Sequence, residues 1–273
     1  MNSASPDRRL KKAEIVESSL VTVMRHLDAA PLAGKRIFIT GGTGFFGLWL
    51  LTALSQLNRQ GAGIGITILS RNPQRFLAAY PQWADCSWLT FIGGNVRDFD
   101  FHEAPFDFLI HAATDTSATA NADPLSIFDD IVIGTRRVLD FAVKSGAKRV
   151  LLASSGAIYG PQPLGVSQIP EDARFACPPD APTSAYGEGK RVMELLGALY
   201  HLEHGIESII ARCFAFVGPG LPLDGHFAIG NFIRDALYAD AIHVNGDGTP
   251  LRSYLYGADV IGVARLPRSQ QMQ

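Results

Sequence analysis

The chain has 273 residues, of which 47% are hydrophobic and 18% are charged, and its formal net charge is −2. These values exclude an intrinsically disordered chain and are typical of a globular protein large enough to bury a substantial core. The near-neutral charge gives no general attraction to nucleic acid or to an anionic membrane. The three cysteines are far apart and no C-x-x-C occurs, so we expect neither a disulfide framework nor a zinc site.

The N-terminal segment differs from the rest of the chain. Residues 1–34 carry charges throughout and lack the apolar segment of a signal peptide, and no apolar run in the chain approaches the ~20 residues that span a bilayer. We therefore expect a cytoplasmic protein with neither a nucleic-acid partner nor a membrane partner. Apolar residues in 15–27 recur at helical spacing. They predict a helical extension over 1–34 that packs on the main domain or on a second subunit, or a solvated helix that caps the sheet.

From residue 35 onward, short apolar segments alternate with helical ones. The pattern predicts strands at 35–40, 65–69, 88–92, 108–111, 149–153 and 206–213, and helices at 45–57, 127–143 and 186–204. Helices of this length between strands imply right-handed crossovers and a parallel sheet. Apolar strands fit a sheet that is covered on both faces. We predict an α/β fold with a Rossmann-type, doubly wound parallel sheet.

Glycines follow the first predicted strand at regular spacing. The motif T-G-G-T-G-F-F-G places Gly41, Gly44 and Gly47 between a strand and a helix, with Thr43, Phe45 and Phe46 in the same turn. Glycines here permit a tight turn, let the backbone approach a pyrophosphate, and let the helix pack closely on the strand. The helix N-terminus favours a bound phosphate group. The motif therefore predicts a dinucleotide-binding turn.

The residues after the second predicted strand bear on the choice of cofactor. A carboxylate there binds the ribose 2′-hydroxyl of NAD, whereas an arginine accommodates the 2′-phosphate of NADP. This chain has Ser70 and Arg71 and no acid at that point. The planar guanidinium of arginine suits phosphate geometry. We predict NADP(H), with NAD(H) as the alternative if Arg71 is an ordinary surface residue.

Three residues are candidates for catalysis. Tyr186 and Lys190 form Y-x-x-x-K at the start of a predicted helix, where residues four apart share a face. We expect the lysine ammonium to lower the tyrosine pKa, so that Tyr186 exchanges a proton with a substrate hydroxyl while hydride moves to or from a nicotinamide ring. Ser155 follows the fifth strand, at the edge where α/β sheets bind ligands. A helix-surface pair and a strand-end serine are the alternatives.

Together these motifs resemble the extended short-chain dehydrogenase/reductases. The resemblance covers about residues 35–260 and rests on T-G-G-T-G-F-F-G, H-A-A, S-S-G-A-I-Y-G and Y-G-E-G-K in this order. The family includes nucleotide-sugar epimerases, 4,6-dehydratases, decarboxylases and reductases. The resemblance implies that Tyr186 transfers the proton, that Lys190 holds the ribose hydroxyls and tunes the tyrosine, and that Ser155 binds the reacting oxygen. It also implies cofactor contacts by Asn95, Val96, Ala112 and Ala113.

The resemblance extends to substrate-binding segments at about 214–256. In 226–233 it implies that Asn231, with Phe232 beside it, touches the substrate diphosphate, and in 246–252 it implies that Arg252 meets the nucleotide phosphates. The substrate so implied is a nucleotide-linked sugar, bound by a domain that spans 35–273. Dimerisation through two long helices is common in the family, so we expect a homodimer.

The sequence departs from the family pattern at several positions. Ile131 and Ala215 stand where the family usually has asparagine. Gly156 and Ala157 stand where sugar 4,6-dehydratases have Asp-Glu, which argues against a dehydratase. Relatives usually continue for tens of residues beyond the segment that matches Val260, so we expect the C-terminal substrate lobe to be partly missing.

The motifs favour an NAD(P)-dependent oxidoreductase or epimerase of a nucleotide-linked sugar, with hydride transfer expected at sugar C4. Two alternatives stay open. One is a dinucleotide-binding protein whose activity is lost or regulatory, because the expected substrate lobe is short. The other is a reductase of a non-nucleotide carbonyl compound.

Overall fold

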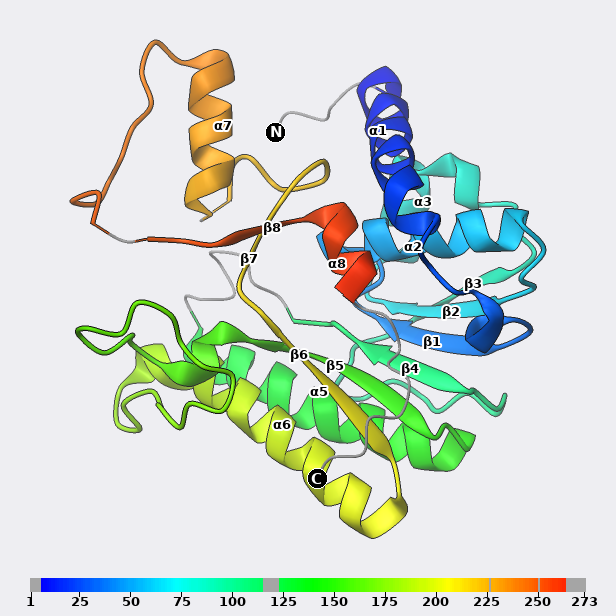
Figure 1. Ribbon diagram of the computed structural model, residues 1–273. Coiled ribbons are helices and arrows are strands. Elements are labelled where there is room, and N and C mark those ends of the chain that lie inside the picture. Colours follow the sequence, from blue (N-terminus) through cyan, green and yellow to red (C-terminus); the bar gives the residue numbers. More distant parts are fainter. Residues whose placement is uncertain (1–5, 115–122, 226, 250, 264–273) are drawn as a thin grey trace.

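The computed structural model describes residues 6–114, 123–225, 227–249 and 251–263 (Figure 1). Six parallel strands form one sheet in the order β3-β2-β1-β4-β5-β6. This order is that of the Rossmann fold, so the predicted fold class is confirmed. The strands are β1 (Arg36–Thr40), β2 (Gly65–Ser70), β3 (Leu89–Gly93), β4 (Phe108–His111), β5 (Arg149–Ser155) and β6 (Glu207–Cys213).

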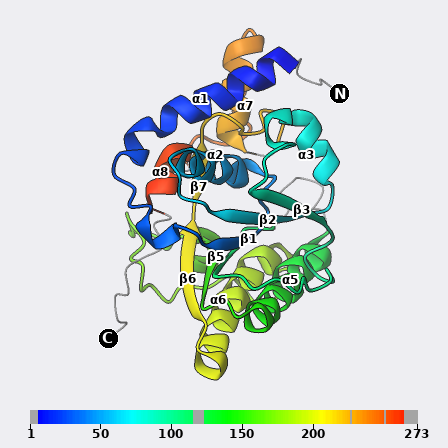
Figure 2. The ribbon, with the colours of Figure 1, turned by 90° about the vertical axis from the view of Figure 1, so that its right-hand side faces the viewer.

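Helices cover both faces of this sheet. Figure 2 shows α2 (Phe45–Arg59) and α3 (Pro73–Ala79) on one side of it, and α5 (Pro124–Ser145) and α6 (Ala185–His204) on the other. Successive side chains of each strand point to opposite faces of the sheet, so each face packs a hydrophobic core against its own helices. In β1, Ile37 and Ile39 belong to the core beneath α2, whereas Phe38 belongs to the core beneath α5, with its ring centroid 4.8 Å from that of Phe141.

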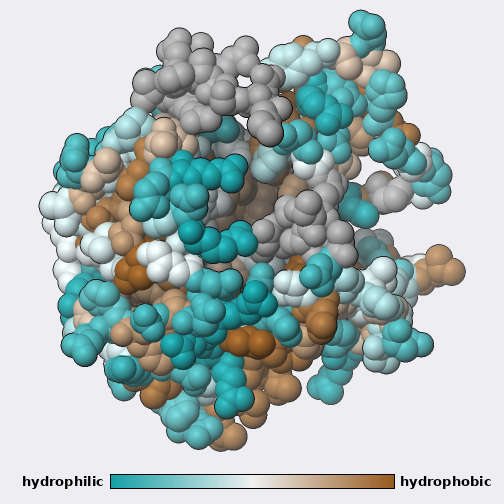
Figure 3. All heavy atoms as spheres, turned by 180° about the vertical axis from the view of Figure 1, so that it is seen from behind, coloured by the Kyte–Doolittle hydropathy of each residue, from teal (hydrophilic) through white to brown (hydrophobic). Residues whose placement is uncertain are grey.

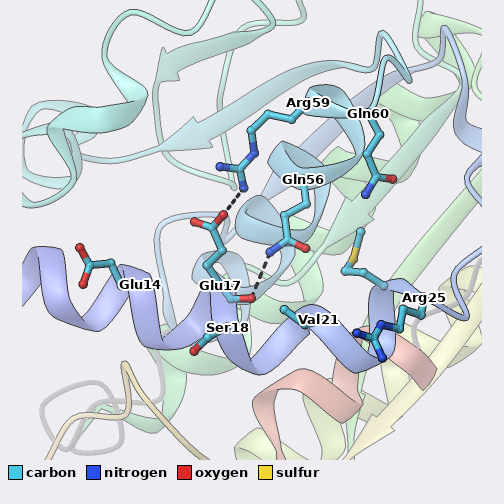
Figure 4. Close-up of a pocket in the computed structure, with 9 residues that line it drawn as sticks. Glu14, Glu17, Ser18, Val21, Arg25, Gln56, Arg59 and Gln60 are labelled. Carbon is cyan, nitrogen blue, oxygen red and sulfur yellow. Dashed lines mark hydrogen bonds and ion pairs between the residues drawn. The ribbon is translucent and has the colours of Figure 1, made fainter.

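The N-terminal helix α1 (Pro6–Met24) packs on the same body. Val16 and Leu20 are fully buried in the core cluster that contains β1 and α2. Figure 4 shows the outer part of this contact, where Arg59 of α2 forms a 2.5 Å ion pair with Glu17 of α1. Gln56 donates a 3.1 Å hydrogen bond to the Glu17 carbonyl oxygen. The helix is therefore part of the main fold, and a domain boundary at residue 34 remains an interpretation.

The C-terminal part adds a small second sheet. β7 (Ala215–Val217) pairs in parallel with β8 (Tyr254–Tyr256), and α7 (Ala228–Tyr238) is set off from the large sheet by extended segments (Figure 1). α8 (Gly257–Val263) returns to pack beside α1 and α2. Short 3-10 helices complete the described elements: η1 (Ala30–Leu32), η2 (Pro81–Trp83), η3 (Gly156–Tyr159) and η4 (Pro182–Ser184).

The predicted strands and long helices all occur, with ends that differ by a few residues. The elements α3, α7, α8, β7 and β8 were not predicted, because they are too short, or too mixed in polarity, for a clear periodic signal in the sequence. In the described part of the chain, no helix combines the length and the hydropathy that a bilayer crossing requires.

Candidate active site

A cavity of about 1350 Å³ lies along the carboxyl ends of the six strands. It is lined by residues that end or follow every strand of the sheet, among them Gly41, Ser70, Gly94, Ala112, Ser155 and Cys213. β1 and β4 are neighbours in the sheet, and the strand order reverses between them. Ligands of open α/β sheets bind at such a switch point, so the cavity lies where the fold class predicts it.

The glycines of the first turn have separate roles. Gly41 has a φ of +75°, and a Cβ on it would lie 2.4 Å from the carbonyl carbon of Ala112. A Cβ on Gly47 would lie 2.2 Å from the carbonyl carbon of Gly42. These two glycines are therefore required by the fold itself, and Gly47 does not line the cavity.

Gly44 is different, because nothing within the fold requires a glycine there. A Cβ on Gly44 would make only an ordinary 3.5 Å contact with the Gly41 carbonyl oxygen. Gly44 is the N-cap of α2 and lines the cavity together with Thr43, Phe45 and Phe46. The first N–H groups of a helix have no partner within the helix and attract anions. The turn therefore fits the pyrophosphate of a dinucleotide.

Residues after β2 and β3 form one end of the cavity. Ser70, Arg71, Asn95 and Val96 line it as predicted. Thr43 Oγ1 lies 3.4 Å from Ser70 Oγ, which links the glycine turn to the end of β2.

Arg75 also lines this end of the cavity, and the analysis of the sequence missed it. Asn72 begins α3 by accepting a 2.9 Å hydrogen bond from the Arg75 N–H. That cap places residue 75 one turn along the helix from the end of β2. The Asn-Pro pair at 72–73 is a helix-start signal that could have revealed Arg75.

Lys190 and Tyr186 meet on the wall formed by β5 and α6. Lys190 is 2% exposed, and its Nζ donates hydrogen bonds of 2.6 Å to the Ala153 carbonyl oxygen and 2.9 Å to Thr114 Oγ1. Nζ also lies 5.8 Å from the centre of the Tyr186 ring. Burial lowers the pKa of Lys190 to about 8. A lysine with this pKa can gain or lose a proton slightly above neutral pH.

The pKa of Tyr186 does not follow the expectation from the sequence. Burial raises the pKa of Tyr186, and the hydrogen bond with the Ser155 hydroxyl only partly opposes this effect. The hydrogen bonds of the Lys190 ammonium go to the Ala153 carbonyl oxygen and to Thr114 Oγ1. The structure thus joins Ser155, Tyr186 and Lys190 in one cavity, but the predicted fall in the tyrosine pKa is not found.

A buried histidine holds the backbone beside this cavity. His111 Nδ1 lies 2.8 Å from Thr40 Oγ1, and Nε2 lies 3.2 Å from Thr135 Oγ1. Thr135 donates its own hydrogen to the Ile131 carbonyl oxygen, so it must accept from Nε2–H, and Nδ1 must accept from Thr40. Thr40 Oγ1 in turn accepts from the Ala113 N–H at 3.3 Å. Ala112 and Ala113 line the cavity as predicted.

A second polar network fixes the end of β5. The Arg212 guanidinium makes a bidentate ion pair with Glu194 at 2.8–3.2 Å, and the Ser154 hydroxyl donates 2.5 Å to the same carboxylate. Arg212 Nη1 also donates to Tyr159 Oη at 2.7 Å. These contacts tie β5, β6 and α6 together directly next to Ser155. Because their members are far apart in the chain, the analysis of the sequence did not find them.

The three residues predicted to bind substrate do not all line the cavity, and their roles stay predictions. Arg252 lines the cavity, whereas Asn231 and Phe232 do not. Asn231 Oδ1 instead accepts a 3.1 Å hydrogen bond from Arg234 on α7. Ala228 and Ile229, the first two residues of α7, line the cavity. Other lining residues are Cys213 and, within the predicted substrate-binding segments at about 214–256, Phe214, Ala215, Phe216, Asp224, Phe227 and Tyr254.

The comparison with protein families identifies the family of this chain. The model of the NAD dependent epimerase/dehydratase family matches residues 37–266, which is most of the chain. The chain belongs to this family. Its sequence is 33% identical over 241 residues to UDP-glucuronic acid decarboxylase 6 of Arabidopsis thaliana, covering 88% of this chain and 68% of the relative. The chain spans about two thirds of the length of this relative and of two similar Arabidopsis decarboxylases.

Solved structures share the fold of this family member. A UDP-N-acetylglucosamine 4-epimerase from Methanobrevibacter ruminantium M1, in complex with UDP-N-acetylmuramic acid, matches with a TM-score of 0.70 and 22% identity, covering 86% of this chain and 72% of that one. A UDP-glucuronic acid 4-epimerase from Bacillus cereus, in complex with UDP-glucuronic acid and NAD, matches with a TM-score of 0.67 and 21% identity, covering 83% and 70%. These structures show the same fold, and the family model together with the Arabidopsis relatives confirms the resemblance to extended short-chain dehydrogenase/reductases.

Proposed function

We propose that this family member is an NADP(H)-dependent oxidoreductase or epimerase that acts at C4 of a nucleotide-linked sugar. One observation carries the proposal: Ser155, Tyr186 and Lys190 line the same cavity as the glycine turn at the start of α2. A binding protein without catalysis has no need for a buried lysine, which costs stability, beside a tyrosine and a serine. This combination favours an enzyme over the alternative of a dinucleotide-binding protein.

Ser155, Tyr186 and Lys190 have separate roles in the proposed reaction. The Ser155 hydroxyl holds the substrate oxygen, and Tyr186 Oη exchanges a proton with that oxygen. In this proposal Lys190 bonds hydroxyl groups of a bound ribose. The nicotinamide, when bound, supplies or receives the hydride. The raised pKa of Tyr186 means that the phenol holds its proton at neutral pH, which suits proton donation to a carbonyl oxygen.

The choice of NADP(H) rests on Arg71 and Arg75. Both line the cavity where β2 ends, at the position that contacts the adenosine ribose in this fold. Two guanidinium groups suit a 2′-phosphate. NAD(H) remains the alternative, since the Bacillus cereus epimerase is a complex with NAD.

A nucleotide-linked sugar is the proposed substrate because relatives of this chain are named for such substrates and because Arg252 adds a cation to the cavity wall. The names of the plant relatives also favour a second reaction, decarboxylation of a nucleotide-linked uronic acid. Oxidation at C4 would precede the loss of the carboxylate in that case, so Ser155, Tyr186 and Lys190 would keep their roles.

We also infer a homodimer built on α5 and α6, in the cytoplasm. Leu195, Leu199 and Leu202 are exposed at i, i+4 and i+7 on one side of α6, and Ile133 and Val143 are exposed on α5. Figure 3 shows hydrophobic atoms gathered in the lower half of the molecule, which contains these helices. Light scattering of the wild type and of Leu199→Glu tests the inference; a monomeric wild type would contradict it.

The test of the proposed function compares the wild type with Tyr186→Phe. Each protein is supplied with NADP⁺ and a panel of UDP- and dTDP-linked sugars, and separately with NADPH and the 4-keto forms of these sugars, and nicotinamide absorbance and product identity are followed. We expect turnover by the wild type and a loss of at least about 100-fold in Tyr186→Phe with cofactor affinity retained. Equal rates in both proteins would contradict the mechanism.

A further inference from the structure

The small sheet of β7 and β8 lines the cavity at one end and is attached to α2 and α1 at the other. At the cavity end, Ala215 lies opposite Tyr254, and both residues line the cavity. Arg252, two residues before Tyr254, lines it as well. At the far end, Val217 lies opposite Tyr256. The position of Arg252 in the cavity therefore depends on what holds β8.

Two aromatic pairs join this sheet to α2. The ring of Phe216 in β7 is stacked on that of Phe45, with centroids 6.1 Å apart and 22° between the planes. The ring of Tyr256 in β8 meets that of Trp49 edge-on, with centroids 5.3 Å apart. The ring centroids of Phe45 and Trp49 are 6.4 Å apart. Because Phe45 belongs to the glycine turn, a row of four rings connects that turn with the end of β8.

Trp49 lies against the backbone that follows both strands of the small sheet. Its side chain is fully buried, and a Cβ on Gly257, the first residue of α8, would lie 2.1 Å from Trp49 Cε2. A Cβ on Gly218, directly after β7, would lie 3.2 Å from Trp49 Cζ2. The indole therefore limits the positions that the sheet can take on α2.

Helix α1 supplies a polar contact at the end of the row. Ser19 Oγ donates a 2.7 Å hydrogen bond to the Ile15 carbonyl oxygen, and it lies 3.0 Å from Tyr256 Oη. A serine hydroxyl has one hydrogen, so the Tyr256 hydroxyl donates the second bond and Ser19 accepts it. Leu20 is buried in the same core cluster as Ala258 of α8, which lies beside α1 (Figure 2). Helix α1 therefore holds the point at which β8 passes into α8.

We propose that Ser19 and Tyr256 are positioning residues, which hold β8 on α1 so that Arg252 is in place to bind the diphosphate of the nucleotide-linked sugar. The inference rests on the proposed function, because that function supplies the diphosphate. Neither Ser19 nor Tyr256 lines the cavity, so both act through β8. Helix α1 precedes residues 37–266, which match the family model, so the match to the family does not include this contact.

The contact acts on an equilibrium between a docked and an undocked β8. A ligand that binds only the docked form loses affinity in proportion to the loss of that form. One hydrogen bond changes such an equilibrium by roughly two- to tenfold, and removal of the Tyr256 ring also removes its contact with Trp49. The glycine turn is fixed separately, by the close packing of Gly41 on Ala112. Affinity for the cofactor should therefore change little.

The experiment measures binding of UDP-glucose and of dTDP-glucose by calorimetry, with NADPH bound, in the wild type, Ser19→Ala, Tyr256→Ala and Arg59→Ala. Arg59→Ala is the matched control, because it removes the ion pair of α2 with Glu17 of α1 and leaves the contact between Ser19 and Tyr256 in place. We expect Tyr256→Ala to weaken binding of the nucleotide sugar at least about tenfold and Ser19→Ala about threefold. Arg59→Ala should change it less than about twofold, and NADPH affinity should change less than about twofold in all three variants.

Hydrogen exchange measures the docking of β8 without a substrate. Backbone amides of residues 254–263 should exchange roughly two- to tenfold faster in Ser19→Ala than in the wild type, whereas those of β1 should not change. Tyr256→Phe removes only the hydroxyl, and Ser19 keeps its bond to the Ile15 carbonyl oxygen in that variant. Its effect should be no larger than that of Ser19→Ala, and it replaces Tyr256→Ala if the alanine variant does not fold.

Two results would overturn the inference and leave the nucleotide-sugar function intact. One is an equal loss of affinity for NADPH and for the nucleotide sugar in Tyr256→Ala, which would indicate a general effect on the fold. The other is an Arg59→Ala protein that loses as much nucleotide-sugar affinity as Ser19→Ala. If the wild type binds neither nucleotide sugar, the proposed function is wrong and the inference falls with it.

Discussion

Gly47, in the first turn of α2, lies against the backbone of Gly42 so closely that a Cβ on residue 47 would stand 2.2 Å from the Gly42 carbonyl carbon. An added Cβ could be accommodated only if β1 or α2 moved. We expect Gly47→Ala to destabilise the protein by about 3 kcal/mol or to prevent folding. Urea denaturation measures the loss.

Gly44→Ala is the matched control for this glycine turn. Its Cβ would meet the Gly41 carbonyl oxygen at an ordinary 3.5 Å, so stability should change by no more than about 1 kcal/mol. The added methyl group faces the cavity, however, and should weaken NADPH binding at least about tenfold. Unchanged NADPH affinity in a stable Gly44→Ala protein would argue against a pyrophosphate at this turn.

Lys190 gives the protein a stability that depends on pH in a known direction. Burial lowers the pKa of Lys190 to about 8 in the folded state, from 10.5 in the reference state. Between these values the unfolded chain binds more protons, so this residue makes stability rise with pH. From pH 7 to pH 9 the wild type should gain about 1 kcal/mol relative to Lys190→Met. Parallel pH profiles for the two proteins would show that Lys190 is not buried as described.

Arg71 and Arg75 should control the choice between the two nicotinamide cofactors. Both side chains line the cavity beside the end of β2. We expect Arg71→Ala to weaken NADPH binding at least about tenfold and NADH binding less than about twofold, because a guanidinium contacts only the 2′-phosphate. Arg75→Ala should act in the same direction with a smaller effect. Fluorescence titration measures both affinities, and equal losses for the two cofactors would favour NAD(H).

His111 should stay neutral at every pH at which the protein is folded. Burial lowers the pKa of His111 to about 3, and the nearby charge of Lys190 adds to this effect. Below the ordinary histidine pKa, the unfolded chain takes up a proton that the folded protein does not. The free energy of unfolding therefore decreases as the pH is lowered. The loss between pH 7.5 and pH 5 should be about 2 kcal/mol relative to His111→Gln.

Nitrogen-15 NMR of labelled histidine provides a direct check that needs no variant. The donor and acceptor roles of Thr40 and Thr135 require a proton on Nε2 and none on Nδ1. The His111 signals should therefore report this tautomer and show no titration from pH 5 to pH 8. A midpoint near pH 6 would mean that the network has been assigned wrongly.

The sequence by itself determined the fold class and predicted that the site lies at the carboxyl ends of the strands. Alternation of apolar residues marks strands, and helical spacing marks the crossovers, because both periodicities are local properties of the backbone. The position of Gly41 and Gly44 between a strand and a helix predicted the phosphate turn. The four-residue spacing of Tyr186 and Lys190 placed both on one face of α6.

Only the tertiary structure decided which residues share the cavity and what surrounds them. β5 and β6 pair with Ser155 opposite Cys213, and this register brings Phe214 over Gly156. The same packing buries Tyr186, which raises its pKa where the sequence predicted a fall, and it gives Asn231 a hydrogen bond from Arg234 on α7. These outcomes depend on contacts between segments tens of residues apart. Local patterns record the periodicity of each element, whereas burial and partners are set by the neighbours that packing supplies.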